Sequence, residues 1–68
     1  MIDIKKNASE VVRVERTVYN GHSLLNVRIW FKDGDVLKPS KKGLTVRTEM
    51  AADLIKAMQH VLQEETAA

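Results

Sequence analysis

Two glycine-containing turns enclose the most regular stretch of the chain and limit what it can fold into. Asn20-Gly21 and Asp33-Gly34 stand at the two ends of residues 22–32. Both dipeptides favour the tight turn of a β-hairpin, because their residues tolerate positive φ. Between them two phases alternate, one formed by Leu25, Val27, Ile29 and Phe31 and the other by Asn26, Arg28, Trp30 and Lys32. The pattern predicts a strand with an apolar face and a polar face that carries a tryptophan.

The remaining segments predict an α+β fold. Residues 10–19 are rich in β-branched side chains and form a strand before the first turn. After the second turn we expect a short strand over 36–38, ended by Pro39, then a loop and a fourth short strand over 44–47. From Thr48 the apolar period becomes helical, which predicts one C-terminal helix to about Gln63. The sequence therefore predicts a four-stranded antiparallel β-sheet followed by one helix that covers one of its faces.

The size of the chain favours a pair of chains over a single one. It has 68 residues, which we take as one domain over 1–68, with an ordered core of about 10–63 and flexible ends at 1–9 and 64–68. Domains of this size are marginally stable alone, and there is no cysteine to form a disulfide. No ligand cluster surrounds either histidine, so we expect no metal and no other cofactor. Homodimerisation is the remaining route to stability.

The distribution of charge indicates an anionic partner and argues against several other classes. Ten of the eleven basic side chains lie in residues 1–48, together with only five of the nine acidic ones. The N-terminus lacks the apolar core of a signal peptide, and no apolar run approaches the roughly 20 residues of a membrane span. We expect a cytoplasmic protein that is nucleoid-associated if bacterial, with no membrane and no small-molecule substrate. No nucleophile–base pair or phosphate-binding loop is present in the sequence, so we expect no enzyme.

The polar face and the stretch "LKPSKKGLTV" supply candidate binding residues. Arg28 and Trp30 share the open face, and an aromatic beside an arginine on such a surface suits unpaired bases. Lys38, Lys41 and Lys42 crowd the following loop and would suit a phosphate backbone. Two alternatives remain open: Trp30 buried in a dimer interface, and Arg28 paired with a carboxylate on a neighbouring strand.

Three motifs together resemble the positive cofactor four family of transcriptional coactivators, in its single-stranded-DNA-binding domain and small stand-alone bacterial members. They are "YNGH", "VRIWF" with Asn26 before it, and "LKPSKKGLTV", and the resemblance extends over about Val11 to Val61. It implies a four-stranded antiparallel sheet with one helix, paired so that two sheets form a groove for unpaired DNA. It also implies roles in that groove for residues at the matched positions: Tyr19, Asn20, His22, Arg28, Trp30, Phe31, Lys38, Lys41 and Lys42.

Several features depart from the family pattern. Asn20 and His22 replace the lysines of the first turn, the second hairpin is one residue shorter, and Ala51 stands where the family often has tryptophan. The alternation places Arg28 and Trp30 on the open face and Phe31 on the other, whereas the resemblance makes Phe31 a base-stacking aromatic. A β-bulge, a strong twist or a position at the strand end could reconcile the two assignments.

These observations lead to one functional hypothesis and two alternatives. We expect a homodimeric, non-enzymatic protein that binds single-stranded DNA with little sequence preference and works with the transcription or replication machinery. The first alternative is a single-stranded RNA binder or RNA chaperone that uses the same surface, because stacking and phosphate contacts do not recognise the sugar. The second is a protein-interaction adaptor, in which Trp30 and the apolar stripe of the helix bind a partner.

Overall fold

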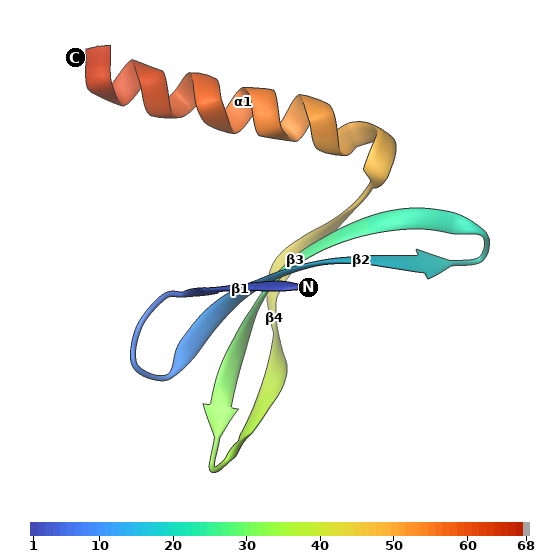
Figure 1. Ribbon diagram of the computed structural model, residues 1–68, viewed down its shortest axis with the longest axis vertical. Coiled ribbons are helices and arrows are strands. Elements are labelled where there is room, and N and C mark those ends of the chain that lie inside the picture. Colours follow the sequence, from blue (N-terminus) through green and yellow to red (C-terminus); the bar gives the residue numbers. More distant parts are fainter. Residues whose placement is uncertain (68) are drawn as a thin grey trace.

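The chain forms one antiparallel sheet followed by one helix. The computed structural model describes the backbone of residues 1–67 and the side chains of residues 1–64. Strands β1 (Ile2–Lys5), β2 (Glu10–Tyr19), β3 (His22–Asp33) and β4 (Val36–Arg47) lie side by side in chain order, and α1 (Thr48–Ala67) follows β4 (Figure 1). The predicted fold class, four antiparallel strands and one C-terminal helix, is confirmed.

The β2–β3 hairpin follows the predicted pattern throughout. Tyr19 pairs with His22, and the two residues between them, Asn20 and Gly21, have φ of 49° and 76°. Positive φ at both central residues is the requirement of a type I′ turn. The pairing then continues without interruption to Glu10 and Phe31, so the two phases of β3 become two faces of the sheet. We call them the polar face, which carries Arg13, Asn26, Arg28 and Trp30, and the apolar face, which carries Val12, Val14, Val27 and Ile29.

The second hairpin turn lies one residue later than predicted. Asp33 pairs with Val36, so the two turn residues are Gly34 and Asp35 rather than Asp33 and Gly34. Gly34 has φ of 64° at the first central position, where a type II′ turn requires a positive value. Asp33 is therefore the last residue of β3, and its carboxylate can face the neighbouring strand.

The basic segment belongs to a long strand, so the predicted loop between two short strands is wrong. Arg28 pairs with Gly43 but Trp30 pairs with Pro39, which leaves residues 40–42 opposite Ile29 alone. This β-bulge keeps both ends of β4 in the ladder. Pro39 is tolerated because β4 is an edge strand. Gly43 is required by close approach, since an added Cβ would lie 2.5 Å from the Val27 carbonyl oxygen.

A strand before Glu10 was not predicted. Ile2–Lys5 pairs along β2, with Ile2 opposite Val14 and Lys5 opposite Val11, and forms the second edge of the sheet. The return to β2 is closed by the backbone N–H groups of Lys6 and Asn7, which both donate to the Glu10 carbonyl oxygen. The N-terminal segment thus adds side chains to both faces of the sheet.

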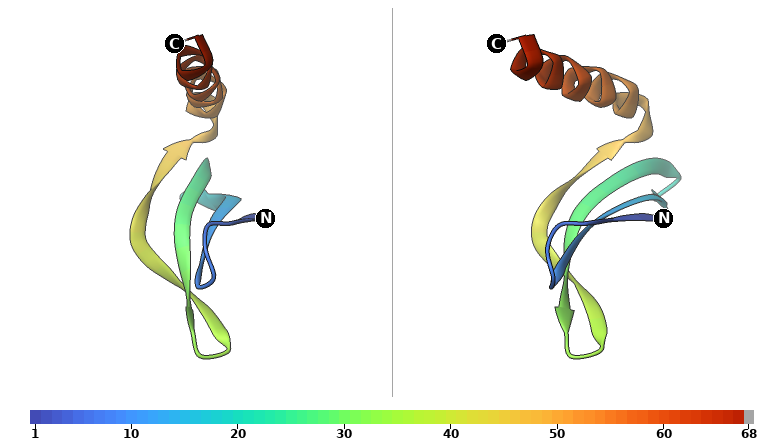
Figure 2. Two further views of the ribbon diagram at one scale, coloured as in Figure 1. Left: turned by 90° about the vertical axis from the view of Figure 1, so that its left-hand side faces the viewer. Right: turned by 60° about the vertical axis from the view of Figure 1, so that its left-hand side comes forward.

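Helix α1 projects from the sheet instead of covering it, so the predicted packing is wrong. The helix begins at Thr48 as predicted and continues to Ala67, past the expected end near Gln63; Ala68 lies outside the described residues. Its main contacts are with the ends of β3 and β4 next to the point where β4 becomes helix (Figures 1 and 2). Arg47 and Thr48 are consecutive, with no loop that could turn the helix back over the sheet.

The described side chains of the single chain, residues 1–64, enclose no core. Among residues 1–64 no side chain is fully buried. The radius of gyration is 14.2 Å, against about 11 Å for a compact domain of this length. Most large apolar side chains of α1 within residues 48–64 remain exposed, and these are Met50, Ile55, Met58, Val61 and Leu62. Within the described residues, no helix combines the length and apolarity needed to cross a membrane.

Candidate nucleic-acid interface

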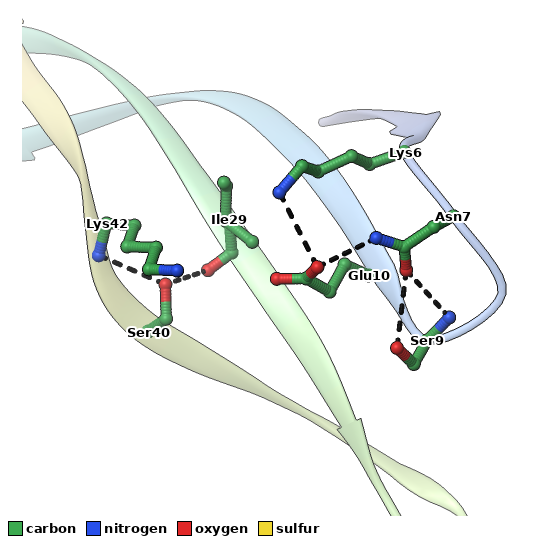
Figure 3. Close-up of polar contacts among 7 residues, drawn as sticks. All are labelled: Lys6, Asn7, Ser9, Glu10, Ile29, Ser40 and Lys42. Atoms are coloured by element: carbon green, nitrogen blue, oxygen red, sulfur yellow. Dashed lines mark hydrogen bonds and ion pairs between the residues drawn. The ribbon is translucent and has the colours of Figure 1, made fainter.

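Ser40 organises the bulge of β4 and joins it to Arg28. Its hydroxyl donates a hydrogen bond to the Ile29 carbonyl oxygen at 2.7 Å and accepts one from the Lys42 N–H at 3.1 Å (Figure 3). Its carbonyl oxygen accepts a hydrogen bond from Arg28 Nη1 at 3.0 Å. Because the ladder is interrupted here, these bonds satisfy backbone groups that the bulge leaves unpaired. Ser40 therefore holds the bulge beside the Arg28 guanidinium.

The three lysines of β4 differ in how far their charge is already compensated. Lys38 Nζ lies 2.7 Å from Asp33 Oδ2, and both side chains are about half exposed. Lys42 lies near Glu10, whose pKa is lowered mainly by a hydrogen bond from Asn7 at 2.8 Å and also by the charges of Lys6 and Lys42. Lys41 is exposed and has no ion pair in the described part of the chain. Lys41 and Lys42 thus offer the more available charge.

On the polar face, Trp30 is covered by Arg13. Arg13 stands opposite Arg28 in the ladder, and its guanidinium lies 4.1 Å from the centroid of the Trp30 ring. Arg13 Nε and Nη2 donate to the two carboxylate oxygens of Asp3 at 2.8 and 3.0 Å. The hydrogen bond from Arg13 lowers the pKa of Asp3, and the same bond raises the pKa of Arg13. The Trp30 Nε1–H is buried and has no acceptor among the described residues.

The aromatic side chains open to solvent are Tyr19 and Phe31. Tyr19 is 68% exposed beside the turn that holds Asn20 and His22. Phe31 is 38% exposed and pairs with Glu10 on one side and Lys38 on the other. The bulge lies in β4 and not in β3, so it leaves Phe31 in the phase of Ile29, opposite to Trp30. A bulge does not bring both aromatics to the same face.

The expected site residues form two separate groups on the chain. The turn group contains Tyr19, Asn20 and His22, and the bulge group contains Arg28, Trp30, Phe31 and the three lysines. Trp30 lies eight positions after His22 along β3, which at about 3.3 Å per residue is roughly 26 Å. A ligand that contacts both groups must therefore be an extended chain.

The sequence analysis did not identify Arg13, which lies on the polar face, or Ser40, which lies in the β4 bulge. A signal for Arg13 was present, because a two-residue turn at Asn20-Gly21 fixes the register and sets Arg13 opposite Arg28. The role of Ser40 depends on the bulge, which the sequence did not indicate. Asn26 and Thr45 also meet on this face, through a hydrogen bond of 3.2 Å.

Comparisons with known proteins agree with this architecture. The profile of the family described as Transcriptional Coactivator p15 (PC4) matches residues 6–57. The chain belongs to the PC4 family. The match confirms the resemblance seen in the sequence. PC4 homologues are DNA-binding proteins linked to transcription and replication. A search of curated protein sequences gives no significant match.

Three solved structures of PC4 homologues share the fold. A PC4 homolog from Burkholderia pseudomallei K96243 is 26% identical in both of its crystal forms. The tetragonal form has a TM-score of 0.84, covering 90% of this chain and 91% of that one, and the orthorhombic form has 0.88, covering 94% and 88%. The bacteriophage T5 homolog, implicated in recombination-dependent DNA replication, is 25% identical with a TM-score of 0.79, covering 96% and 77%.

The Asp3–Arg13 ion pair predicts a stability difference that disappears in acid. The folded-state pKa of Asp3 is depressed, so its contribution is present above its ordinary pKa and is lost as the pH falls through the lower folded-state value. Asp3→Asn should therefore lower the urea midpoint at neutral pH and leave it unchanged below that value. The pKa of Glu10 is also lowered, but Glu10 is present in both chains. The difference between their urea midpoints therefore reports the contribution of Asp3. A midpoint difference that is constant from neutral to acid pH would contradict a stabilising ion pair.

Proposed function

We propose that this PC4-family chain binds single-stranded DNA with little sequence preference, as a non-enzymatic cofactor of transcription, replication or repair in the cytoplasm. The observation that carries the proposal is the bulge of β4, where Arg28 and the exposed Lys41 and Lys42 gather beside open strand surface. Arginine and lysine neutralise phosphates irrespective of base sequence. The PC4 family and the implication of the T5 homolog in recombination-dependent DNA replication support the same assignment.

The proposed contacts divide between phosphates and bases. Arg28, Lys38, Lys41 and Lys42 contact the backbone, and Asn20 and His22 contribute hydrogen bonds at the turn. Tyr19 and Phe31 stack on bases, because both rings are exposed. Trp30 contributes as the support of the Arg13 guanidinium, which occupies one face of its ring. Stacking accepts every base, so this division implies low sequence preference.

We further propose that two copies pair through the apolar face of the sheet and the exposed stripe of α1. A single chain leaves both surfaces uncovered, and no side chain among residues 1–64 is fully buried. Several exposed apolar side chains gathered on one surface are typical of a protein interface. Pairing through the helix stripe and the part of the apolar face that carries Val12, Val14 and Val27 would leave the polar face, the β4 edge and Phe31 near the end of β3 open for the nucleic acid.

The lysines of the bulge should set the salt dependence of binding. Lys41→Ala with Lys42→Ala should weaken binding to oligothymidine and to mixed sequences alike. Each lost phosphate contact flattens the slope of log K against log salt by about 0.7. Lys56→Ala, on the helix, is the control for the loss of one positive charge, and each single variant of Lys41 and Lys42 is compared with it. The role of the bulge is wrong if the double variant binds like the unchanged chain at every salt concentration.

Phe31 should contribute one base–aromatic stack to binding. Phe31→Ala should weaken binding by about 1–3 kcal/mol, the usual contribution of one base–aromatic stack. Its salt slope should stay the same, because no phosphate contact is removed. Phe31→Tyr, which keeps the ring, serves as the control. Equal affinity of Phe31→Ala and Phe31→Tyr would exclude stacking at this position.

Dimerisation should depend on the apolar stripe of α1. Val61→Asp places a charge among Met58 and Leu62, so the variant should lose the dimer and, with it, much of its folded structure. Sedimentation equilibrium and circular dichroism measure the two losses. Gln59→Asp, on the same helix but outside the stripe, is the control. A folded monomer for the unchanged chain would contradict the proposed pairing.

Competition separates the proposal from its alternatives. The proposed stacking and phosphate contacts do not recognise the sugar, so oligonucleotides of one sequence in DNA and RNA form should be set in direct competition. Tighter binding of the DNA form would support the proposal. Preference for RNA would support an RNA chaperone that uses the same surface. No affinity for either nucleic acid at low salt would support an adaptor that binds protein.

A further inference from the structure

The polar face holds a second arginine beside Arg28. Arg13 and Arg28 are direct partners in the β2–β3 ladder, so both side chains emerge from the same face at adjacent positions. Arg28 is bonded to the sheet through the Ser40 carbonyl. Arg13 is bonded instead to Asp3, a carboxylate supplied by edge strand β1.

The Asp3 carboxylate occupies the donating edge of the Arg13 guanidinium. Arg13 donates through Nε and Nη2 in parallel, at 2.8 and 3.0 Å, to the two oxygens of one carboxylate. A guanidinium presents this fork equally well to carboxylate and to phosphate. The Trp30 ring lies 4.1 Å away and supports the flat face of the guanidinium, leaving the donating edge to the anion.

The Asp3 carboxylate can be displaced from Arg13. Strand β1 has four residues and pairs only with β2, so few bonds hold it. The Asp3 side chain is 32% exposed and the Arg13 side chain 14%, so solvent and ligand reach the pair from the carboxylate side. Glu15 adds negative charge near Arg13 without a hydrogen bond to it. The carboxylate of this ion pair is open to solvent and Asp3 is held by a short edge strand, so a polyanion can compete with it for the Arg13 guanidinium.

We propose that Arg13 is a further phosphate contact of the polar face and that Asp3 is its intramolecular competitor. The inference rests on the proposed function, since it assigns an additional contact to the same single-stranded ligand. In the free protein Asp3 neutralises the arginine and holds it over Trp30. In the complex the phosphate replaces the carboxylate at the same edge, so the measured affinity is lower than the polar face alone would give.

A cycle of variants tests the proposal with labelled oligothymidine over a salt series. Asp3→Asn should raise affinity about three- to tenfold at low salt and steepen the salt slope by about 0.7, the value for one added phosphate contact. Asp35→Asn removes the same charge from a turn residue and should raise affinity about twofold or less, with no change in slope. In an Arg13→Gln background, Asp3→Asn should have no larger effect than Asp35→Asn.

A second measurement does not depend on how the variants fold. The Arg13 Nε–H resonance of the unchanged chain should shift on addition of oligothymidine, as its acceptor changes from carboxylate to phosphate. An unshifted resonance in the saturated complex would overturn the proposal. So would an Asp3→Asn variant that gains no more affinity than Asp35→Asn, or that binds more weakly, since Asp3 would then only attach β1. If the unchanged chain does not bind at all, the proposed function fails together with this inference.

Discussion

The unbroken ladder between β2 and β3 is the constraint on which the rest of the structure depends. The type I′ turn at Asn20-Gly21 fixes its register, and a shift by one residue would move every side chain of β3 to the other face. With the observed register, Arg28 and Trp30 meet Arg13 on one face, and Val27 and Ile29 meet the valines of β2 on the other. The separation of a polar surface from a surface to be buried therefore follows from this hairpin.

The β4 bulge turns a sheet edge into a basic surface. Three residues stand opposite Ile29, and the Ser40 hydroxyl supplies hydrogen bonds that the ladder loses there. Gly43 allows the strand to return against Val27 and Arg28, where a side chain has no room. Lys41 and Lys42 are thus presented by a strand held at both ends, which orders their backbone more strongly than the predicted loop would.

Much of the fold could be predicted because its signals are local. The alternation of β3, the Asn20-Gly21 turn and the change of period at Thr48 each depend on a few neighbouring residues. Strand β1 was missed, although Ile2 and Ile4 alternate with polar residues and Asn7 and Ser9 give a turn signal; Asn7 Oδ1 accepts the Ser9 N–H at 3.0 Å (Figure 3). The bulge depends on the pairing of β4 with β3, which are distant in places along the chain. The direction of α1 depends on the absence of a loop after Arg47. Neither feature is visible in the hydrophobic periodicity.

The candidate site shows the same division between local and long-range information. The sequence identified Arg28 and the lysines, but it treated Trp30 as open for stacking. Whether that ring is open depends on Arg13 and Asp3, which come from two other strands. Because these contacts cover Trp30, Phe31 is the better stacking candidate. Phe31 is in the apolar phase, but it lies near the end of β3, where its ring remains exposed.

The most direct test of the account is the fluorescence anisotropy of labelled oligothymidine, about 20 nucleotides long, titrated with the protein over a salt series and challenged with unlabelled duplex. The account predicts tight binding that duplex does not displace, weakened by salt with a log–log slope of about −0.7 for each phosphate neutralised. Absence of binding at low salt, or displacement by duplex as effective as by unlabelled single strand, would contradict it.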